Sequence, residues 1–164
     1  MWFDVEPVEI DFLETSPFRI ENDAIINAPP ERVFEILTNG EGQKEWFQDF
    51  VGFRWTSAEP HGAGSTREVE LKMLAVKERF LVWEPGERLA FTVTAITLPV
   101  VSRMIEDMQF ERMGDRTRFR WTVHYTPTLA MRAVHPVARG IFGKMFAVTA
   151  SGLTNYAARN ATAA

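Results

Sequence analysis

The chain has 164 residues, a net charge of −4 and no cysteine. This length predicts a single domain with a sizeable core, and the lack of cysteine excludes disulfides, thiolate metal sites and cysteine nucleophiles. Acidic and basic residues are mixed along the chain, so we expect no nucleic-acid partner, no basic helix for a membrane surface and no stable membrane insertion. With no secretory signal in residues 1–16, these properties predict a soluble, cytoplasmic protein.

Residues 1–16 are too apolar for a free tail, because Trp2, Phe3, Val5 and Phe12 stand among acidic residues. We expect this N-terminal extension to pack along the domain formed by residues 17–164, where it can add an extra strand. Packing against a partner chain is the alternative, so both a monomer and a homodimer remain open.

A strand and two short helices are predicted next. Residues 18–28 contain several β-branched side chains, which favour a strand. A helix then begins at Pro29-Pro30-Glu31, where proline and an acidic residue suit the first turn, and it ends at Asn39-Gly40. A second helix is expected at about 41–48, carrying Trp46.

Between residues 50 and 125 the apolar residues recur with a period of two, which predicts six short strands. Turn sequences separate the strands, among them residues 59–64, 84–86 and 114–115. Strands with this spacing and tight turns are typical of an antiparallel meander with one solvated face.

Residues 135–160 are predicted to form one long helix with a broad apolar face. Pro136 suits its first turn. A helix of this kind needs a concave partner, which the strands can supply. We expect four of its residues in the core, namely Ile141, Val148, Leu153 and Tyr156. Four others are expected in a pocket wall, namely Phe142, Met145, Phe146 and Thr149.

Three short motifs resemble a known superfamily in their order and spacing. They are Ile25-Ile26-Asn27-Ala28-Pro29-Pro30-Glu31-Arg32-Val33-Phe34, then Gly62-Ala63-Gly64-Ser65-Thr66-Arg67, then Trp83-Glu84-Pro85-Gly86-Glu87-Arg88-Leu89. With them, residues 18–160 are similar to the START-like, or helix-grip (SRPBCC), superfamily, in particular its polyketide cyclase/dehydrase-like branch. The resemblance implies an α+β helix-grip fold. About seven antiparallel strands would curve around the C-terminal helix, with two short helices after the first strand and a cavity between sheet and helix.

The resemblance implies three alternative functions. The first is binding of a hydrophobic or aromatic small molecule, such as a lipid or polyketide, in that cavity. The second is a polyketide cyclase/dehydratase-type enzyme that uses a cavity carboxylate without a metal or organic cofactor. The third is a co-chaperone-like interaction module with a filled core.

Candidate ligand-binding residues are those in phase with the concave face, together with the pocket wall of the last helix and Trp46 at the cavity mouth. The strand candidates are Arg67, Glu78, Phe80, Phe91, Val93, Met104, Glu106, Met108, Trp121 and Tyr125.

Four of these candidates are polar, namely Arg67, Glu78, Glu106 and Tyr125. Buried charges are costly unless they are paired, so one interpretation is an internal Arg–Glu network. The other is that these groups hold a polar group of the ligand, with Glu78, Glu106 or Tyr125 as catalytic candidates. The three histidines lack metal-ligand spacing, so no metal site is expected.

Overall fold

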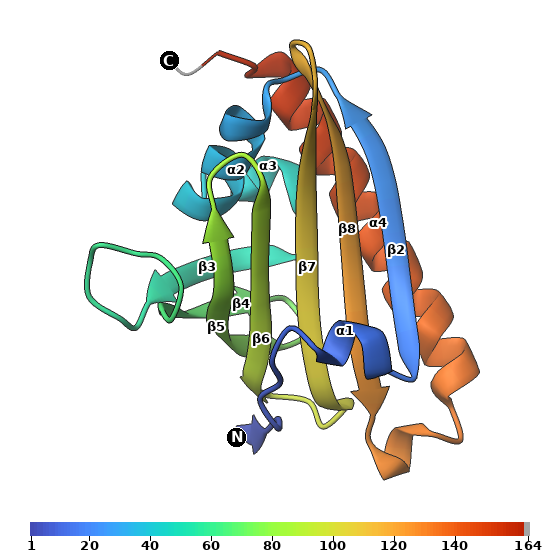
Figure 1. Ribbon diagram of the computed structural model, residues 1–164. Helices are drawn as coiled ribbons and strands as arrows, with labels where there is room; N and C mark the ends of the chain where they lie inside the picture. The colour runs from blue at the N-terminus through green and yellow to red at the C-terminus, as the bar shows by residue number, and fades with distance from the viewer. Residues whose placement is uncertain (163–164) are drawn as a thin grey trace.

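The computed structural model describes residues 1–162 and shows a curved antiparallel sheet wrapped around one long helix (Figure 1). Seven strands form the main sheet in the order β2-β8-β7-β6-β5-β4-β3. Their bounds are β2 Phe18–Ile26, β3 Phe50–Trp55, β4 Thr66–Leu71, β5 Ala75–Glu84, β6 Arg88–Ile96, β7 Val101–Met113 and β8 Arg116–Pro127. The long helix is α4, His135–Arg159. The predicted helix-grip fold is thus confirmed.

Two short helices, α2 (Pro30–Asn39) and α3 (Gln43–Trp46), follow β2 as predicted. Proline stands at the start of α2, where a missing N–H costs little, and Gly40 ends the helix with a φ of 70°. Gly42 also has a positive φ, and a β-carbon there would collide with the ring of Tyr156 on α4. This glycine therefore lets α3 pack closely against the end of α4.

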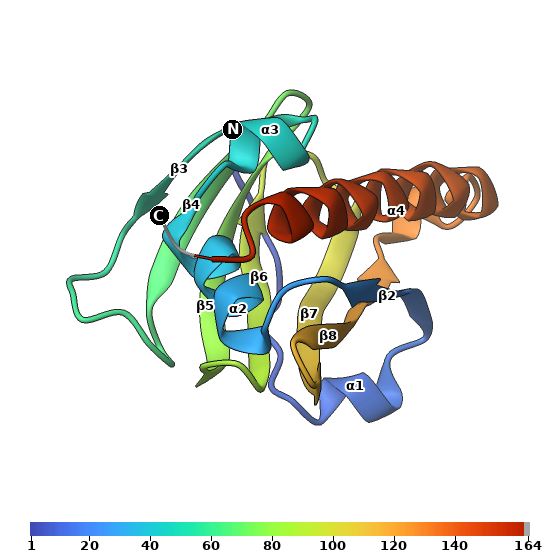
Figure 2. The same ribbon diagram turned by 90° about the horizontal axis from the view of Figure 1, so that it is seen from above.

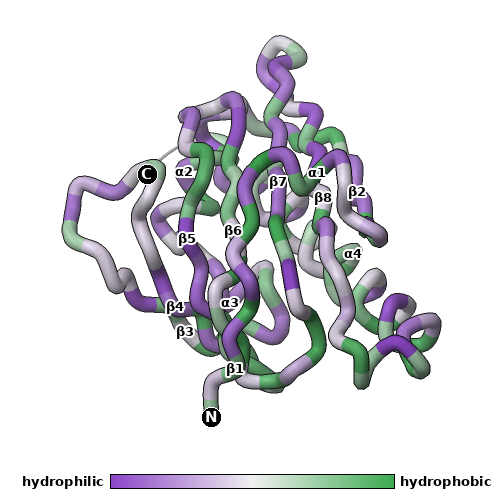
Figure 3. Tube along the Cα trace, turned by 60° about the horizontal axis from the view of Figure 1, so that its bottom comes forward, coloured by the Kyte–Doolittle hydropathy of each residue, from purple (hydrophilic) through white to green (hydrophobic). Residues whose placement is uncertain are grey.

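Hydrophobic and hydrophilic residues alternate along the sheet (Figure 3). The β7 and β8 strands pair from Val101 with Pro127 to Met113 with Arg116, which makes them the longest hairpin. Register shifts occur in the β3–β4, β5–β6 and β7–β8 pairs. Such irregularities bend strands, so they help the sheet to curve around α4.

Helix α4 is buried along only part of its length. Its buried residues are His135, Phe146, Thr149, Ala150, Leu153, Tyr156 and Ala157. The prediction that Ile141 and Val148 are core residues is wrong, because they are 66% and 44% exposed. Both lie on the side of the helix that faces away from the sheet. Within residues 1–162, no helix is both long and apolar enough to cross a membrane.

Residues 1–16 run across the convex face of the sheet, on the side opposite to α4 (Figure 2). They form a two-residue strand, β1 (Phe3–Asp4), which pairs with β6, and the short helix α1 (Phe12–Thr15). Val8 and Phe12 bury their side chains against Ile105 of β7. The Val8 N–H also donates to Oγ1 of Thr92, which is 3.1 Å away. This segment thus covers apolar residues on the outer face of the sheet.

Candidate ligand-binding site

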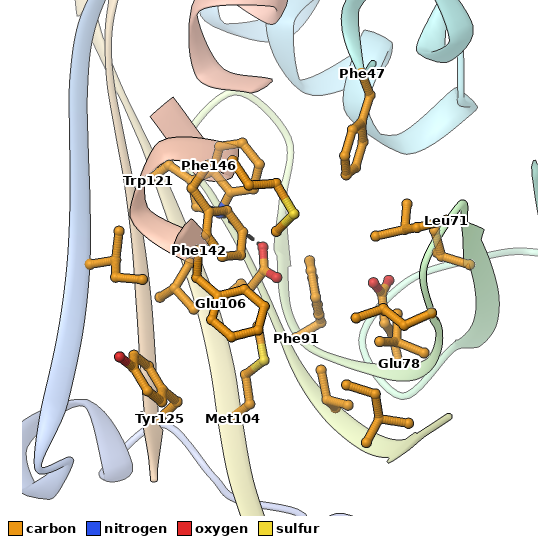
Figure 4. Close-up of a pocket in the computed structure, with 18 of the residues that line it drawn as sticks. Phe47, Leu71, Glu78, Phe91, Met104, Glu106, Trp121, Tyr125, Phe142 and Phe146 are labelled. Atoms are coloured by element: carbon orange, nitrogen blue, oxygen red, sulfur yellow. Dashed lines mark hydrogen bonds between the residues drawn. The ribbon is translucent and has the colours of Figure 1, made fainter. Parts of the chain in front are cut away.

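A cavity of about 120 Å³ lies between the concave face of the sheet, α3 and the N-terminal half of α4 (Figure 4). On this scale one water molecule needs roughly 10–15 Å³, so the cavity has room for several waters or for a ring-sized group. Most of the lining is apolar. The polar side chains in it are Gln43, Arg67, Glu78, Glu106 and Tyr125.

The structure brings thirteen of the fifteen predicted site residues together around this cavity. They are Trp46, Arg67, Glu78, Phe91, Val93, Met104, Glu106, Met108, Trp121, Tyr125, Phe142, Met145 and Phe146. The strand residues meet there because alternate side chains of adjacent strands share one face of the sheet.

Phe80 and Thr149 are buried, but the structure places them outside the cavity lining. The Phe80 ring is covered by the guanidinium of Arg67, whose Cζ lies 4.9 Å from the ring centroid, and by Trp55. Thr149 turns its hydroxyl back to the carbonyl of Met145, at 2.9 Å. Both residues are thus buried as expected, but they do not line the cavity.

The two-residue period of the strands does not identify several of the lining residues. They come from α2, α3, β2 and the strand ends, namely Ile20, Leu37, Gln43, Phe47, Leu74, Ile96, Val100 and Val101. Their side chains reach the cavity because the sheet curves and α3 covers one end of it. The only signal in the sequence is the apolar character of the connection at 97–102. It predicts a loop folded onto the core, or else an apolar entrance rim or a contact with a partner or membrane.

Arg67 and Glu78 form a buried ion pair on adjacent strands. Nε of Arg67 lies 2.6 Å from Oε2 of Glu78, and the two residues are opposite each other in the β4–β5 register. Burial raises the pKa of Glu78, while the charge and hydrogen bond of Arg67 oppose that rise. Nη1 of Arg67 is buried without a partner among the described residues. The cavity floor therefore holds a hydrogen-bond donor that is not fully satisfied.

Glu106 stands apart from this ion pair. The indole N–H of Trp121 donates to its Oε2 at 2.9 Å. Burial, and secondarily the nearby charge of Glu78, raises the pKa of Glu106 to about 8. At neutral pH the carboxyl is therefore mostly protonated. Since the indole N–H already donates to Oε2, we expect the acidic proton on Oε1.

The two cavity carboxyl groups, of Glu78 and Glu106, lie on either side of Phe91 (Figure 4). The rings of Trp121, Phe142 and Phe146 gather on the Glu106 side, whereas Leu71 lies near Glu78. A flat ligand that rests on Phe91 would thus meet an apolar wall and a carboxyl group at each edge.

Tyr125 does not face the cavity as a free phenol. Its hydroxyl shares a 2.9 Å hydrogen bond with Nε2 of His135, at the start of α4. Burial raises the pKa of Tyr125, so the phenol remains neutral. The sequence offers no signal for this contact, which links the end of β8 to the long helix. No cluster of histidine, aspartate and glutamate suited to a metal ion occurs among residues 1–162.

Comparison with known proteins agrees with this geometry. Residues 17–158 match the family described as polyketide cyclase / dehydrase and lipid transport, and the chain belongs to this family. An uncharacterized protein of Mycobacterium tuberculosis, Rv2574, is 34% identical over 119 residues, which cover 72% of this chain and 71% of the relative.

Solved structures with low sequence identity share the fold. TTHA0849 from Thermus thermophilus has a TM-score of 0.71 at 18% identity, and the match covers 88% of this chain and all of that one. A START superfamily protein from Mycobacterium smegmatis has a TM-score of 0.71 at 11% identity, and the match covers 84% of this chain and 95% of that one. The ZhuI aromatase/cyclase from Streptomyces sp. R1128 has a TM-score of 0.64 at 15% identity, and the match covers 88% of this chain and 99% of that one.

Proposed function

We propose that this protein binds a small, flat and mainly apolar molecule between Phe91 and α4, with a hydroxyl or carbonyl group of the ligand at Glu106. The observation that carries the proposal is the apolar cavity that holds the buried Glu106 carboxyl, to which the Trp121 indole N–H donates. Apolar walls supply affinity by burial, and a few fixed polar groups supply orientation. Membership of a family described by cyclase/dehydrase activity and lipid transport supports the same class of ligand.

The test uses 2-naphthol as a probe, with naphthalene as the matched compound that lacks the hydroxyl. We expect 2-naphthol to shift the NMR signal of the Trp121 indole N–H, which contacts Glu106. The change Glu106→Leu should weaken the binding of 2-naphthol more than the binding of naphthalene, because the hydroxyl of 2-naphthol loses its hydrogen-bond partner. Native mass spectrometry of protein from its own host would identify a co-purifying ligand.

Adjacent positions on β7 offer a matched pair of variants. Met104 lines the cavity, whereas the Arg103 side chain is 43% exposed and pairs with Glu6 on the convex face. Met104→Trp should block the cavity and abolish binding of both probes, while Arg103→Trp should leave binding unchanged. Equal binding by the two variants would show that the probes bind elsewhere.

An enzyme of the cyclase/dehydratase type is the second candidate, and the protonated state of Glu106 favours it. A carboxyl with a pKa of about 8 in an apolar cavity can donate or accept a proton near neutral pH. For this candidate Glu106→Gln should abolish turnover of a bound substrate but retain its binding. Full turnover by that variant would exclude Glu106 as the acid or base. The co-chaperone-like alternative predicts a filled core, which the cavity does not support.

A further inference from the structure

The lining residues at one end of the cavity are only partly buried, among them Phe47, Leu71, Leu74, Val100, Phe142 and Met145, and they mark its opening and the surface around it. We call this surface the mouth rim, and it consists of residues 47–50, 71–75, 97–100 and 128–145. Backbone hydrogen bonds join neighbouring segments. They run from Lys72 N to Asp49 O at 2.9 Å, from Thr97 N to Ala75 O at 3.0 Å and from Thr128 N to Val100 O at 3.2 Å. The mouth rim is therefore a connected surface.

The mouth rim exposes large apolar side chains that the fold leaves uncovered. Half of the exposed large hydrophobic residues lie on it, namely Met73, Leu98, Leu129, Val134, Val137 and Ile141. Met73 and Leu129 are 79% and 80% exposed. Single exposed apolar residues need no explanation, but a group of them around a cavity opening indicates an interaction surface.

The charge of the mouth rim is opposite to that of the whole chain. The chain has a net charge of −4, and all of its acidic residues precede Arg116. The rim carries four cations, Lys72, Arg132, Arg139 and Lys144, and one anion, Asp49, which pairs with Lys72 at 3.8 Å. Because acidic and basic residues are mixed over the full sequence, its overall charge does not reveal this local excess of positive charge. The expectation of no basic helix for a membrane surface does not take this excess into account.

We propose that the mouth rim docks on the surface of an anionic lipid bilayer, so that the cavity opening faces the apolar phase. The proposal rests on the proposed function, because a rim of this kind would pass an apolar ligand between membrane and cavity. Exposed apolar side chains enter the headgroup region, while the cations contact lipid phosphates. Docking of this kind leaves the helix on the membrane surface.

A second copy of the chain fits this surface less well. Closed two-fold dimers bring the same patch of both copies together. The three cations of residues 128–145 would then face three others, with no acidic residue in that segment to compensate them.

Co-sedimentation with vesicles tests the proposal without any ligand. Wild-type protein should bind vesicles of phosphatidylcholine and phosphatidylglycerol in equal amounts at low salt, and should not bind pure phosphatidylcholine. High salt should release it. Lys144→Ala should weaken binding about fivefold, because one cation near an anionic membrane contributes about a factor of five. The double change Val137→Asp and Ile141→Asp should abolish binding, and both positions are exposed enough to preserve the fold.

Matched controls lie on the β7–β8 hairpin, at the opposite end of the sheet (Figure 1). Met113→Asp and Arg116→Ala change an exposed apolar residue and a cation there, and they should leave vesicle binding unchanged. Equal losses from rim and hairpin variants, absence of wild-type binding, or a rim-dependent dimer in light scattering would each overturn the proposal. If vesicles bind while 2-naphthol does not, the docking surface stands and the proposed ligand site fails.

Discussion

Two glutamates on the same concave face both have a raised pKa, but the groups beside them differ. Glu78 has the guanidinium of Arg67 at 2.6 Å, which favours its ionised form against the cost of burial. Glu106 has only the indole N–H of Trp121, a neutral donor that compensates little of that cost. The period-two pattern places both residues inside, but it cannot show which one has a cationic partner.

The raised pKa of Glu106 predicts how stability depends on pH. A group that is easier to protonate in the folded state reduces stability as pH rises above its unfolded pKa. The variant Glu106→Gln is the reference, because it retains an acceptor for the Trp121 indole N–H but does not titrate. Relative to this variant, the unfolding free energy of the wild type should fall by up to about 1.4 kcal/mol per pH unit between roughly pH 4.5 and 8. Urea unfolding of both proteins across this range measures the difference. Parallel pH profiles would contradict the assigned protonation state.

The Arg67–Glu78 pair predicts strong coupling between the two positions. Arg67→Met removes the partner of a buried carboxylate, which should cost about 3–5 kcal/mol of unfolding free energy. Replacing both residues, with Arg67→Met and Glu78→Leu, should cost less than the sum of the single changes. A double-mutant cycle by denaturant unfolding measures the coupling, and additive effects would show that the pair is not a unit.

At the level of elements, α4 carries two apolar stripes. One stripe contains Phe146, Leu153 and Ala157 and packs on the sheet and the short helices. The other contains Val137, Ile141 and Val148 and faces outward. Both have helical spacing, so periodicity alone cannot decide which one is buried. The error at Ile141 and Val148 follows from this ambiguity.

Two glycines on α4, Gly152 and Gly140, should respond to substitution by alanine with opposite changes in unfolding free energy. A β-carbon at Gly152 would collide with the backbone carbonyl of Trp46, whereas Gly140 has no neighbour within 4 Å. Gly152→Ala should lower the unfolding free energy by about 1–3 kcal/mol through overpacking against α3. Gly140→Ala should raise it by up to about 1 kcal/mol, because alanine favours helix. Thermal unfolding compares the two variants, and stabilisation by both would rule out the tight contact at Trp46.

At the scale of the whole molecule, the sheet separates two apolar regions. The concave side holds the cavity, and the convex side holds the smaller cluster of Val8, Phe12 and Ile105. Phe12→Ala should therefore lower the unfolding free energy by about 3–5 kcal/mol while 2-naphthol binding to the folded protein stays unchanged. Chemical denaturation and probe titration of the same sample measure both quantities. A loss of binding without a loss of stability would show coupling through the sheet.

Much of the architecture could be predicted from the sequence because strand and helix periods are local properties. Alternation between residues 50 and 125 indicated nine of the ten strand residues expected around the cavity. Gln43, Phe47 and Val100 could not be placed, because their position depends on how α3 and the turns close over the curved sheet. The hydrogen bond between Tyr125 and His135 depends equally on where α4 begins relative to β8.

Residue type and spacing are enough to specify the order of the main elements, the inward phase of the strands and the absence of thiol chemistry. Three features are settled only when the chain is folded, namely which stripe of α4 is buried, which carboxyl has a cationic partner and where the cavity opens. Those features depend on the curvature of the sheet and on contacts between segments far apart in the chain. Burial and partner distance set the state of Glu106, and neither is a property of local sequence.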